Sequence, residues 1–373
     1  MVMNPLVFFL GLILLFSCSV PKESTSAFAE ELDLFFNNQF PADNPGGAVM
    51  IIKDNNVIFS KGYGLADMKT KQVITPTTLF NLGSISKTFV ANAILILQEQ
   101  GKLSVEDNLL MYFPNFKDKA IAKKVRIKHL LTHTSGLPDN RQVWKDTAFY
   151  LTAKDAENWY PITQTDTFAF EPGSHFEYSN PAFNGLALII EQVSGMKWQQ
   201  FIAENIFKPS GMITSTITDG AHPDKGVSHA YVLNHNHWQE DDYGEEPTFC
   251  AAGNGGVWSS VEELAKYELA IRTSKFLKAK TIADSRMIKN FPNWNGETPP
   301  FIGWSWFITK QDSLTLVGHS GSQGGFLSNY VTIYEKGIFF VILCNAPREE
   351  YEMKKTTSHV LEVLNKYNWF DVL

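Results

Sequence analysis

Strand patterns lie near both ends of the chain, and helical patterns fill the stretch between them. Close to the N-terminus, GGAVMIIKD (46–54) and NVIFSKGYG (56–64) flank the turn residues Asp54 and Asn55, which predicts a β-hairpin. Further apolar runs bounded by turn residues follow late in the chain, at 301–308, 313–320, 326–335 and 337–346. We therefore predict an α/β fold of the α+β type, with an antiparallel sheet built from both chain ends.

Two amphipathic segments frame these strands. AFAEELDLFFNNQF (27–40) places Phe28, Leu32 and Phe36 on one helical face, and residues 348–367 form a similar closing helix. These helices are expected to cover one face of the sheet, and a mostly helical inserted lobe, about 84–259, to pack against the other. We expect a single domain over 27–370, with a cleft where its two lobes meet.

Composition narrows the classes of function. The 373 residues are 44% hydrophobic, enough for a large core, so the chain is not a disordered protein. Its 32 basic and 39 acidic residues give a net charge of -7 without a long run of either sign. A nucleic-acid partner is therefore not expected, whereas a small-molecule or peptide substrate is compatible with this charge.

The first residues read as an export signal. The apolar run from Leu6 to Phe16 is about half of the ~20 residues that a spanning helix needs. Leu15-Phe16-Ser17-Cys18 resembles the lipobox of bacterial lipoproteins, although Phe16 is bulky for its position and no Lys or Arg precedes the run. We expect a signal peptide at 1–17, a lipid on Cys18 and a polar tether at 18–26. The product would be anchored to a membrane in the cell envelope or periplasm; simple secretion and an uncleaved anchor are the alternatives.

The chain has three cysteines, and if Cys18 carries lipid then Cys250 and Cys344 remain. Cys344 lies in an apolar predicted strand, which favours a buried thiol over a disulfide. Neither a disulfide framework nor a thiolate metal site is expected, and no cofactor is implied.

The pattern Ser-x-x-Lys occurs three times. Ser19 lies in the flexible leader, and Ser194 ends a helix at Gly195, so neither shares a helical face with its lysine. Ser84 follows Gly83 and starts the apolar run KTFVANAILILQEQGK, so that Lys87 lies one turn further on the same face. Burial would lower the pKa of Lys87 and let it accept the Ser84 proton; a plain helix cap with a surface lysine is the simpler alternative.

Two further segments could complete such a site. Tyr178-Ser179-Asn180 is the only Tyr-x-Asn in the chain and lies in a proline-bounded loop, where Tyr178 could relay a proton and Asn180 bind a substrate carbonyl. A cation beside Tyr178 would lower its pKa. The small residues of His319-Ser320-Gly321 would let a substrate backbone approach a strand edge. Taken singly, each segment is also compatible with ordinary packing or a tight turn.

Together, Ser84-x-x-Lys87, Tyr178-x-Asn180 and His319-x-Gly321 resemble, in order, the three motifs of the serine β-lactamase and penicillin-binding-protein family. The branch is that of class C β-lactamases, D-Ala-D-Ala carboxypeptidases and related esterases. The resemblance extends through HLLTHTSGLP, FEPGSHFEYSNPAFNGLALIIEQVSG and AAGNGGVWSSVEELAKY, covering nearly all of residues 27–365.

This resemblance implies a role for each motif residue. Ser84 would be the nucleophile, Lys87 and Tyr178 its bases, and Asn180 and His319 would contact substrate. The backbone N–H groups of Ser84 and Ser322, which follows Gly321, would form the oxyanion hole. The implied function is an exported serine hydrolase that forms an acyl-enzyme on a D-Ala-D-Ala-type peptide, a β-lactam or an ester.

The third motif departs from the family pattern. Class C β-lactamases usually carry lysine where this chain has His319, and a neutral imidazole attracts a carboxylate less than an ammonium does. This favours a peptidase or esterase over an efficient β-lactamase. A penicillin-binding-like sensor or scaffold with little turnover is the alternative class.

Two other patterns suggest different chemistry. Gly318 to Ser322 resembles a Gly-x-Ser-x-Gly nucleophile elbow, but a strand is predicted after it, so Ser320 is not expected to be the nucleophile. A metal-dependent hydrolase would use His235, His237, Asp241 and Asp242, but a solvated loop is favoured there. His133 is expected to be a satisfied structural histidine.

Overall fold

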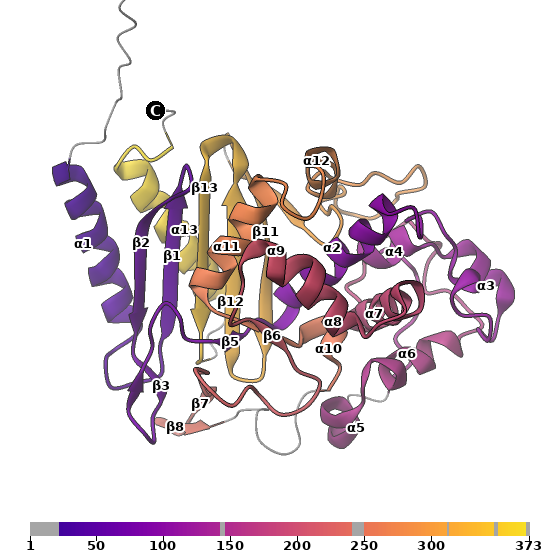
Figure 1. The fold of residues 1–373 in the computed structure, drawn as a ribbon, viewed down its shortest axis with the longest axis horizontal. Helices are drawn as coiled ribbons and strands as arrows, with labels where there is room; N and C mark the ends of the chain where they lie inside the picture. Colours follow the sequence, from indigo (N-terminus) through magenta and orange to yellow (C-terminus); the bar gives the residue numbers. More distant parts are fainter. Residues whose placement is uncertain (1–21, 142–145, 241–249, 312, 347–349, 371–373) are drawn as a thin grey trace, which may run out of the picture.

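The computed structural model describes residues 22–141, 146–240, 250–311, 313–346 and 350–370. Its main sheet has six antiparallel strands in the order β10-β11-β12-β13-β1-β2 (Figure 1). The strands are β1 (Gly47–Lys53), β2 (Asn56–Tyr63), β10 (Phe307–Gln311), β11 (Leu314–Gln323), β12 (Phe326–Ile333) and β13 (Ile338–Cys344). Because β1 pairs with β13, the two ends of the chain meet at the centre of the sheet, and the predicted fold is confirmed.

The turn chemistry explains where the first strands begin and end. Asp54 and Asn55 both have positive φ, 48° and 66°, as a two-residue β-hairpin turn between β1 and β2 requires. The predicted strand at 301–308 is largely wrong, because β10 starts only at Phe307. Ser305, with φ of 63°, interrupts the extended backbone ahead of it.

Helices cover both faces of the sheet. Helices α1 (Lys22–Gln39) and α13 (Glu350–Lys366) pack on one face, where Val49 and Ile51 of β1 share a hydrophobic cluster with Phe36 and Leu364. The alternate β1 residues point to the other face, which α11 (Val261–Arg272) covers. With both faces covered, every residue of β1 and β13 is buried.

The N-terminal region is only partly described. The signal expected at 1–17 and the lipid site expected at Cys18 lie outside the described residues. Helix α1 begins at Lys22, so residues 22–26 of the predicted tether belong to that helix. No helix within the described ranges combines the length and the apolar character needed to cross a bilayer.

The segment between the two strand groups is mostly helical and forms the second lobe (Figure 1). Its α-helices are α2 (Ser86–Glu99), α3 (Lys119–Lys124), α4 (Ile127–Leu131), α5 (Thr147–Thr152), α6 (Asp155–Thr163), α7 (Asn180–Ser194), α8 (Trp198–Ile202), α9 (Lys208–Ser210) and α10 (Ala252–Gly255). The turns η1 (Gly83–Ile85), η2 (Leu109–Met111) and η3 (Ala203–Phe207) lie among them. After α11, helix α12 (Ala279–Ser285) precedes β10, and the turn η4 (Tyr334–Lys336) links β12 to β13.

The described residues also contain short strands that pair in three small sheets. They are β3 (Leu65–Asp67) with β4 (Gln72–Val73), β5 (Phe80–Asn81) with β9 (Val257–Ser259) and β6 (Thr216–Ile217), and β7 (Tyr231–Asn234) with β8 (His237–Glu240). Because β9 pairs with β5, it fixes the chain just before η1 and α2.

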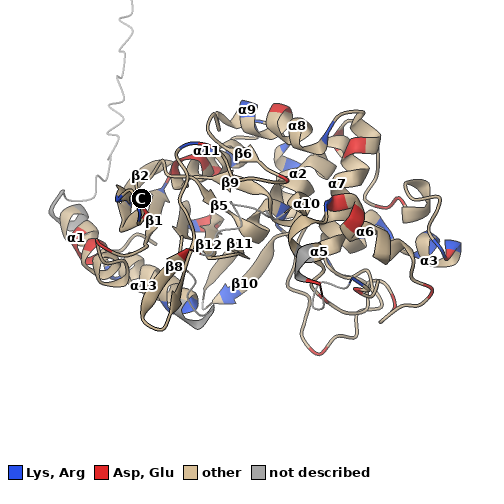
Figure 2. Cartoon of the chain, turned by 90° about the horizontal axis from the view of Figure 1, so that it is seen from below, with Lys and Arg blue, Asp and Glu red and all other residues tan. Residues whose placement is uncertain are grey.

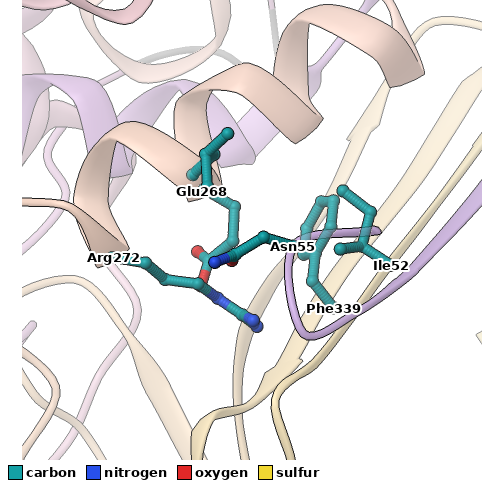
Figure 3. A pocket seen from close by; sticks show the side chains of 6 residues that line it. Ile52, Asn55, Glu268, Arg272 and Phe339 are labelled. Atoms are coloured by element: carbon teal, nitrogen blue, oxygen red, sulfur yellow. The ribbon is translucent and has the colours of Figure 1, made fainter. Parts of the chain in front are cut away.

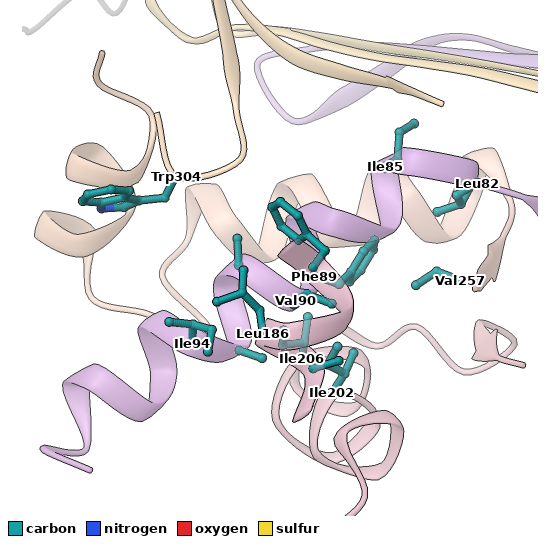
Figure 4. Close-up of a cluster of buried hydrophobic side chains, with 14 of the residues drawn as sticks. Leu82, Ile85, Phe89, Val90, Ile94, Leu186, Ile202, Ile206, Val257 and Trp304 are labelled. Carbon is teal, nitrogen blue, oxygen red and sulfur yellow. The ribbon is translucent and has the colours of Figure 1, made fainter. Parts of the chain in front are cut away.

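Helix α2 is the core of the second lobe. Residues 86–97 are all buried, and Phe89, Val90 and Ile94 pack among side chains from α7, α8 and η3 (Figure 4). A helix that is buried on every side is held in place by packing against its neighbours, so its side chains have little freedom. This rigidity matters for the one lysine that α2 buries.

A buried ion-pair cluster fastens α11 to the sheet. Glu268 is 1% exposed and accepts hydrogen bonds from Arg272 at 2.8 Å and from Arg286 at 2.6 Å. Glu268 and Arg272 line a small pocket with Asn55, Ile52 and Phe339 at the β1–β2 turn (Figure 3). Both charges of this pocket are paired, so we assign it a structural role.

Candidate active site

Ser84 lies in η1, between the sheet and α2. Its predecessor Gly83 has φ of 51°, and the Gly83 N–H donates to Asn81 Oδ1 at 2.8 Å. Ser84 was predicted to start the helix, but α2 begins two residues later, at Ser86. Ser84 is partly exposed between buried neighbours, as a nucleophile must be.

Lys87 points at Ser84 from the first turn of α2. Its Nζ donates to Ser84 Oγ at 3.0 Å and to the backbone oxygen of Asn254 at 2.7 Å. The Lys87 side chain is fully buried, and its amine lies over the rings of Tyr178 and Phe183. The prediction that these two residues share a face is confirmed.

Burial decides the charge of Lys87. Desolvation, and next the positive charge of Arg141, hold the pKa of this amine well below its usual value of 10.5. The Arg141 guanidinium is itself engaged by Asp139, with Nε and Nη2 donating at 2.8 and 2.7 Å. The lowered pKa favours the uncharged amine, which is the form of Lys87 that can take the Ser84 proton.

Tyr178 meets Ser84 from the loop before α7, and the two hydroxyls are hydrogen-bonded. The sequence suggested that a neighbouring cation would lower the pKa of Tyr178. The direction is the opposite one: desolvation of the phenol raises the pKa of Tyr178 more strongly than the Ser84 hydrogen bond lowers it, although 39% of the residue is exposed. The phenol is thus a proton donor at neutral pH rather than a ready base.

The contact to the lysine amine comes from Asn254 and not from Asn180. Asn180 begins α7 two residues after Tyr178. Among the described residues, however, the lysine amine bonds to Ser84 and to the Asn254 carbonyl rather than to the Asn180 amide. The sequence did not single out Asn254; the stretch AAGNGG around it was quoted only as part of a resemblance.

Strand β11 supplies an open edge beside Ser84. It pairs with β10 only as far as Gly318 and continues to Gln323. The two-residue turn after Gln323 makes Gln323 and Phe326 a hydrogen-bonded pair, so alternate residues bond to β12. The backbone groups of Ser320 and Ser322 therefore face the free edge.

Two glycines let that edge touch η1. A Cβ on Gly83 would lie 2.7 Å from the Ser322 nitrogen, and a Cβ on Gly321 would lie 2.9 Å from the Ser84 nitrogen. The backbones of Ser84 and Ser322 are thus adjacent, as the predicted oxyanion hole needs. Only glycine at both positions permits this approach.

His319 closes the site on the β11 side. It is 3% exposed, its Nδ1 lies 2.6 Å from the Ser320 oxygen, and Phe307 packs edge-on against its ring. Burial, and next the positive charge that Lys87 carries when it is protonated, lower the pKa of His319 to about 3. His319 is therefore a neutral imidazole throughout the physiological range.

His133 lies closer to the site than predicted. Its ring stacks on Tyr178 with centroids 4.3 Å apart, and its Nδ1 accepts the Ser179 N–H at 3.0 Å. Its Nε2, although buried, has no hydrogen-bond partner among the described residues, so His133 is not fully satisfied. The sequence indicated only a structural role for His133, because ring stacking between distant loops leaves no local pattern.

Other candidate residues lie away from this chemistry. Ser320 is exposed and points to the opposite face of β11 from His319, and the strand continues through it, so no nucleophile elbow forms. Ser86 accepts the Val257 N–H at 3.0 Å and is fully buried. Both Cys250 and Cys344 are thiols rather than a disulfide.

The metal pattern finds no support among the described residues. His235 lies in the β7–β8 turn with φ of 48°, His237 begins β8, and Asp241 and Asp242 lie outside the described residues. Within the described ranges, no group of three His, Cys, Asp or Glu side chains could hold a metal ion. Basic and acidic residues are interspersed in Figure 2, without a continuous basic stripe in that view.

This geometry is that of a lysine-assisted serine nucleophile beside two backbone donors, the arrangement that acyl transfer requires. The model of the Beta-lactamase family matches residues 38–365, and the chain belongs to this family. A penicillin-binding protein of Bacillus subtilis is 28% identical over 335 residues, covering 84% of this chain and 72% of the relative.

Solved structures of similar fold include a penicillin-binding protein homologue and an amidase. A penicillin-binding protein homologue from Pyrococcus abyssi, described as octameric, is 27% identical with a TM-score of 0.74, covering 86% of this chain and 73% of that one. A D-amino acid amidase from Ochrobactrum anthropi has a TM-score of 0.75 at 20% identity, covering 93% of this chain and 99% of that one, which shows the fold. Family membership supports a serine hydrolase in general terms.

Proposed function

We propose that this protein is an exported serine hydrolase that forms an acyl-enzyme on Ser84 and prefers esters or amides without a carboxylate beside the scissile bond. The observation that carries the proposal is the buried Lys87 amine 3.0 Å from Ser84 Oγ, whose pKa desolvation holds well below its usual value. A solvent-exposed lysine at this spacing would be charged and could not accept the serine proton.

The proposed reaction uses groups already in contact. Lys87 takes the Ser84 proton as Ser84 Oγ bonds to the carbonyl carbon, and the N–H groups of Ser84 and Ser322 stabilise the oxyanion. When the bond to the leaving group breaks, Tyr178 protonates that group and regains a proton from the Lys87 ammonium. Water then attacks the ester on Ser84, giving its proton back through the same residues.

The proposed substrate preference rests on His319. A β-lactam and a D-Ala-D-Ala peptide both carry a carboxylate on the leaving-group side of the scissile bond, and there this chain offers a buried, neutral imidazole packed against Phe307. A carboxylate entering this place would lose water without gaining an opposite charge, which is costly. An ester or neutral amide does not incur that cost.

Export and lipidation at Cys18 are the second part of the proposal, supported by the apolar run from Leu6 to Phe16 and the Ser17-Cys18 pair after it. Labelling of cells with radioactive palmitate should mark the full-length protein and not a Cys18→Ala variant. A label retained by Cys18→Ala, or no label on either form, would refute this part.

Fluorescent penicillin and a short-chain nitrophenyl ester test the catalytic proposal. At a high penicillin concentration, which offsets the cost of its carboxylate, intact mass should show an adduct on the wild-type protein and none on Ser84→Ala. Turnover should be faster on the ester than on a chromogenic cephalosporin. If neither labelling nor ester hydrolysis distinguishes wild type from Ser84→Ala, the enzyme proposal fails and a sensor or scaffold becomes the better interpretation. A cephalosporin rate above the ester rate would refute the substrate preference alone.

A further inference from the structure

We propose that Asp155 is a positioning residue: it fixes α10 so that the Asn254 carbonyl holds Lys87 against Ser84. Asp155 begins α6 and does not touch Ser84 or Lys87. The inference rests on the proposed acylation of Ser84, and it names a support for that reaction outside the three motifs.

Asp155 gathers hydrogen-bond donors from three helices. Its Oδ1 accepts the Gly253 N–H of α10 at 2.9 Å and the Asn184 side-chain amide of α7 at 2.6 Å. Its Oδ2 accepts the Trp198 indole N–H of α8 at 3.0 Å. Asp155 itself is 7% exposed. A buried carboxylate with three donors holds those donors in fixed positions.

The network continues from α10 to the catalytic lysine. Asn254 follows Gly253, and its side-chain amide donates to Asn184 Oδ1 at 3.1 Å. The backbone oxygen of the same Asn254 accepts from Lys87 Nζ at 2.7 Å. Asp155 thus secures both neighbours of the carbonyl that aims Lys87: the N–H before it and, through Asn184, the side chain beside it.

Helix α10 packs closely against Asp155 and α7 at Gly253. A Cβ on Gly253 would lie 3.0 Å from Asp155 Oδ1 and 2.9 Å from the Ala187 Cβ. The short helix is therefore seated directly on the carboxylate and on α7. If that seat changed, the Asn254 carbonyl would move, and Lys87 would lose one of its two hydrogen-bond partners.

The choice of aspartate over asparagine follows from the donors. Every group that bonds to the Asp155 side chain is a donor, so both of its oxygens must accept. Burial raises the pKa of Asp155 to about 6, so at pH 8 the carboxylate is still ionised and can accept all three. An asparagine would turn one N–H toward a donor and force the two apart.

Allele-specific rescue tests this. Asp155→Asn places an amide N–H against the Trp198 N–H, and Trp198→Phe removes that conflict. We expect Asp155→Asn to lower the acylation rate on the nitrophenyl ester about 10- to 100-fold with little change in KM, since misplacement of a reacting group by about 1 Å costs up to about 100-fold. The double variant Asp155→Asn/Trp198→Phe should recover much of this loss. Asp155→Ala, which has no acceptor, should not be rescued by Trp198→Phe.

Asn92→Ala separates positioning from general stability. Asn92 lies on the same helix as Lys87 and donates a buried hydrogen bond to Tyr267, away from the Asp155 network. This control should lower Tm without a matching fall in the acylation rate of the folded protein. Circular dichroism at the assay temperature verifies that each variant is folded.

The outcomes separate this inference from the proposed function. A wild type that acylates, with Asp155→Asn acylating equally fast, overturns the inference and leaves the proposed function standing. Equal rescue of Asp155→Ala and Asp155→Asn also overturns it. If the wild type shows neither a penicillin adduct nor ester hydrolysis above that of Ser84→Ala, the proposed function is refuted and the inference falls with it.

Discussion

Replacing His319 with lysine should move the substrate preference toward carboxylates. His319 is 3% exposed and neutral, and its ring centroid lies 6.5 Å from that of Tyr178. An introduced lysine at this position would place an amine where a β-lactam carboxylate would lie. Its charge would also act on Lys87 in the direction of a lower pKa, so the proposed base would not be lost.

The size of the effect follows from the contact that is gained. A hydrogen bond to a charged group contributes about 1.5–3 kcal/mol. Since about 1.4 kcal/mol corresponds to a tenfold change, the cephalosporin-to-ester ratio of kcat/KM should rise about 10- to 150-fold in His319→Lys. Part of this gain is offset because burial opposes charging of the new amine, so the lower half of the range is expected.

The assay is steady-state hydrolysis of a chromogenic cephalosporin and a nitrophenyl ester, each for wild type and variant. Ser320→Lys is the matched control, because Ser320 neighbours His319 on β11 but is exposed on the opposite strand face. It adds the same charge without placing it in the site, so the ratio should not change. An unchanged ratio in His319→Lys, or an equal rise in Ser320→Lys, would refute the account of specificity.

Three further predictions follow from the same geometry. Because the pKa of Lys87 lies well below 10.5, kcat/KM on the ester should not rise as the pH passes through the ordinary lysine range near 10.5; a rise with the ordinary lysine pKa would contradict this. Burial acts to raise the pKa of Glu268, but its two arginine partners lower it to about 2, so its stabilisation is present above 4.5 and lost as pH falls toward 2. Glu268→Gln should therefore cost about 3–5 kcal/mol in urea unfolding at pH 7, with the difference from wild type shrinking below about pH 4. Gly83→Ala should lower kcat about 100-fold or more by displacing the Ser322 nitrogen, whereas Gly101→Ala, with φ of 69° but nothing within 4 Å, should lose only stability.

The fold was predictable because its signals are local. The hydrophobic period and the turn residues predicted the first hairpin and the closing helix. Pairing of the two strand groups was predicted because one antiparallel sheet is the simplest arrangement that joins them. The strand predicted at 301–308 was wrong because a contact with a distant part of the chain shapes the backbone there. Aromatic residues suggested a strand there, but the positive φ of Ser305 depends on its backbone contact with Leu131, which no nearby residue reveals.

The site was predictable only where spacing carries geometry. Ser84 and Lys87 are one helical turn apart, so sequence alone brings them together. Asn254 could not be found in this way, because it acts through a backbone oxygen that every residue type possesses. Asp155 was missed for a related reason: its three donors come from separate helices, and only the folded chain brings them to one carboxylate.

The charge of the site depends on the fold even more strongly. Lys87, His133 and His319 are three basic side chains whose positive forms are each disfavoured first by burial and then by a neighbouring positive group. The two imidazoles both feel Lys87, so any charge on Lys87 would make it harder to protonate either of them. A lysine that starts neutral can accept the Ser84 proton, but the same environment leaves a substrate carboxylate without a counter-charge. The burial that lowers the pKa of Lys87 thus also favours an uncharged substrate. The buried, neutral His319 favours an uncharged substrate as well.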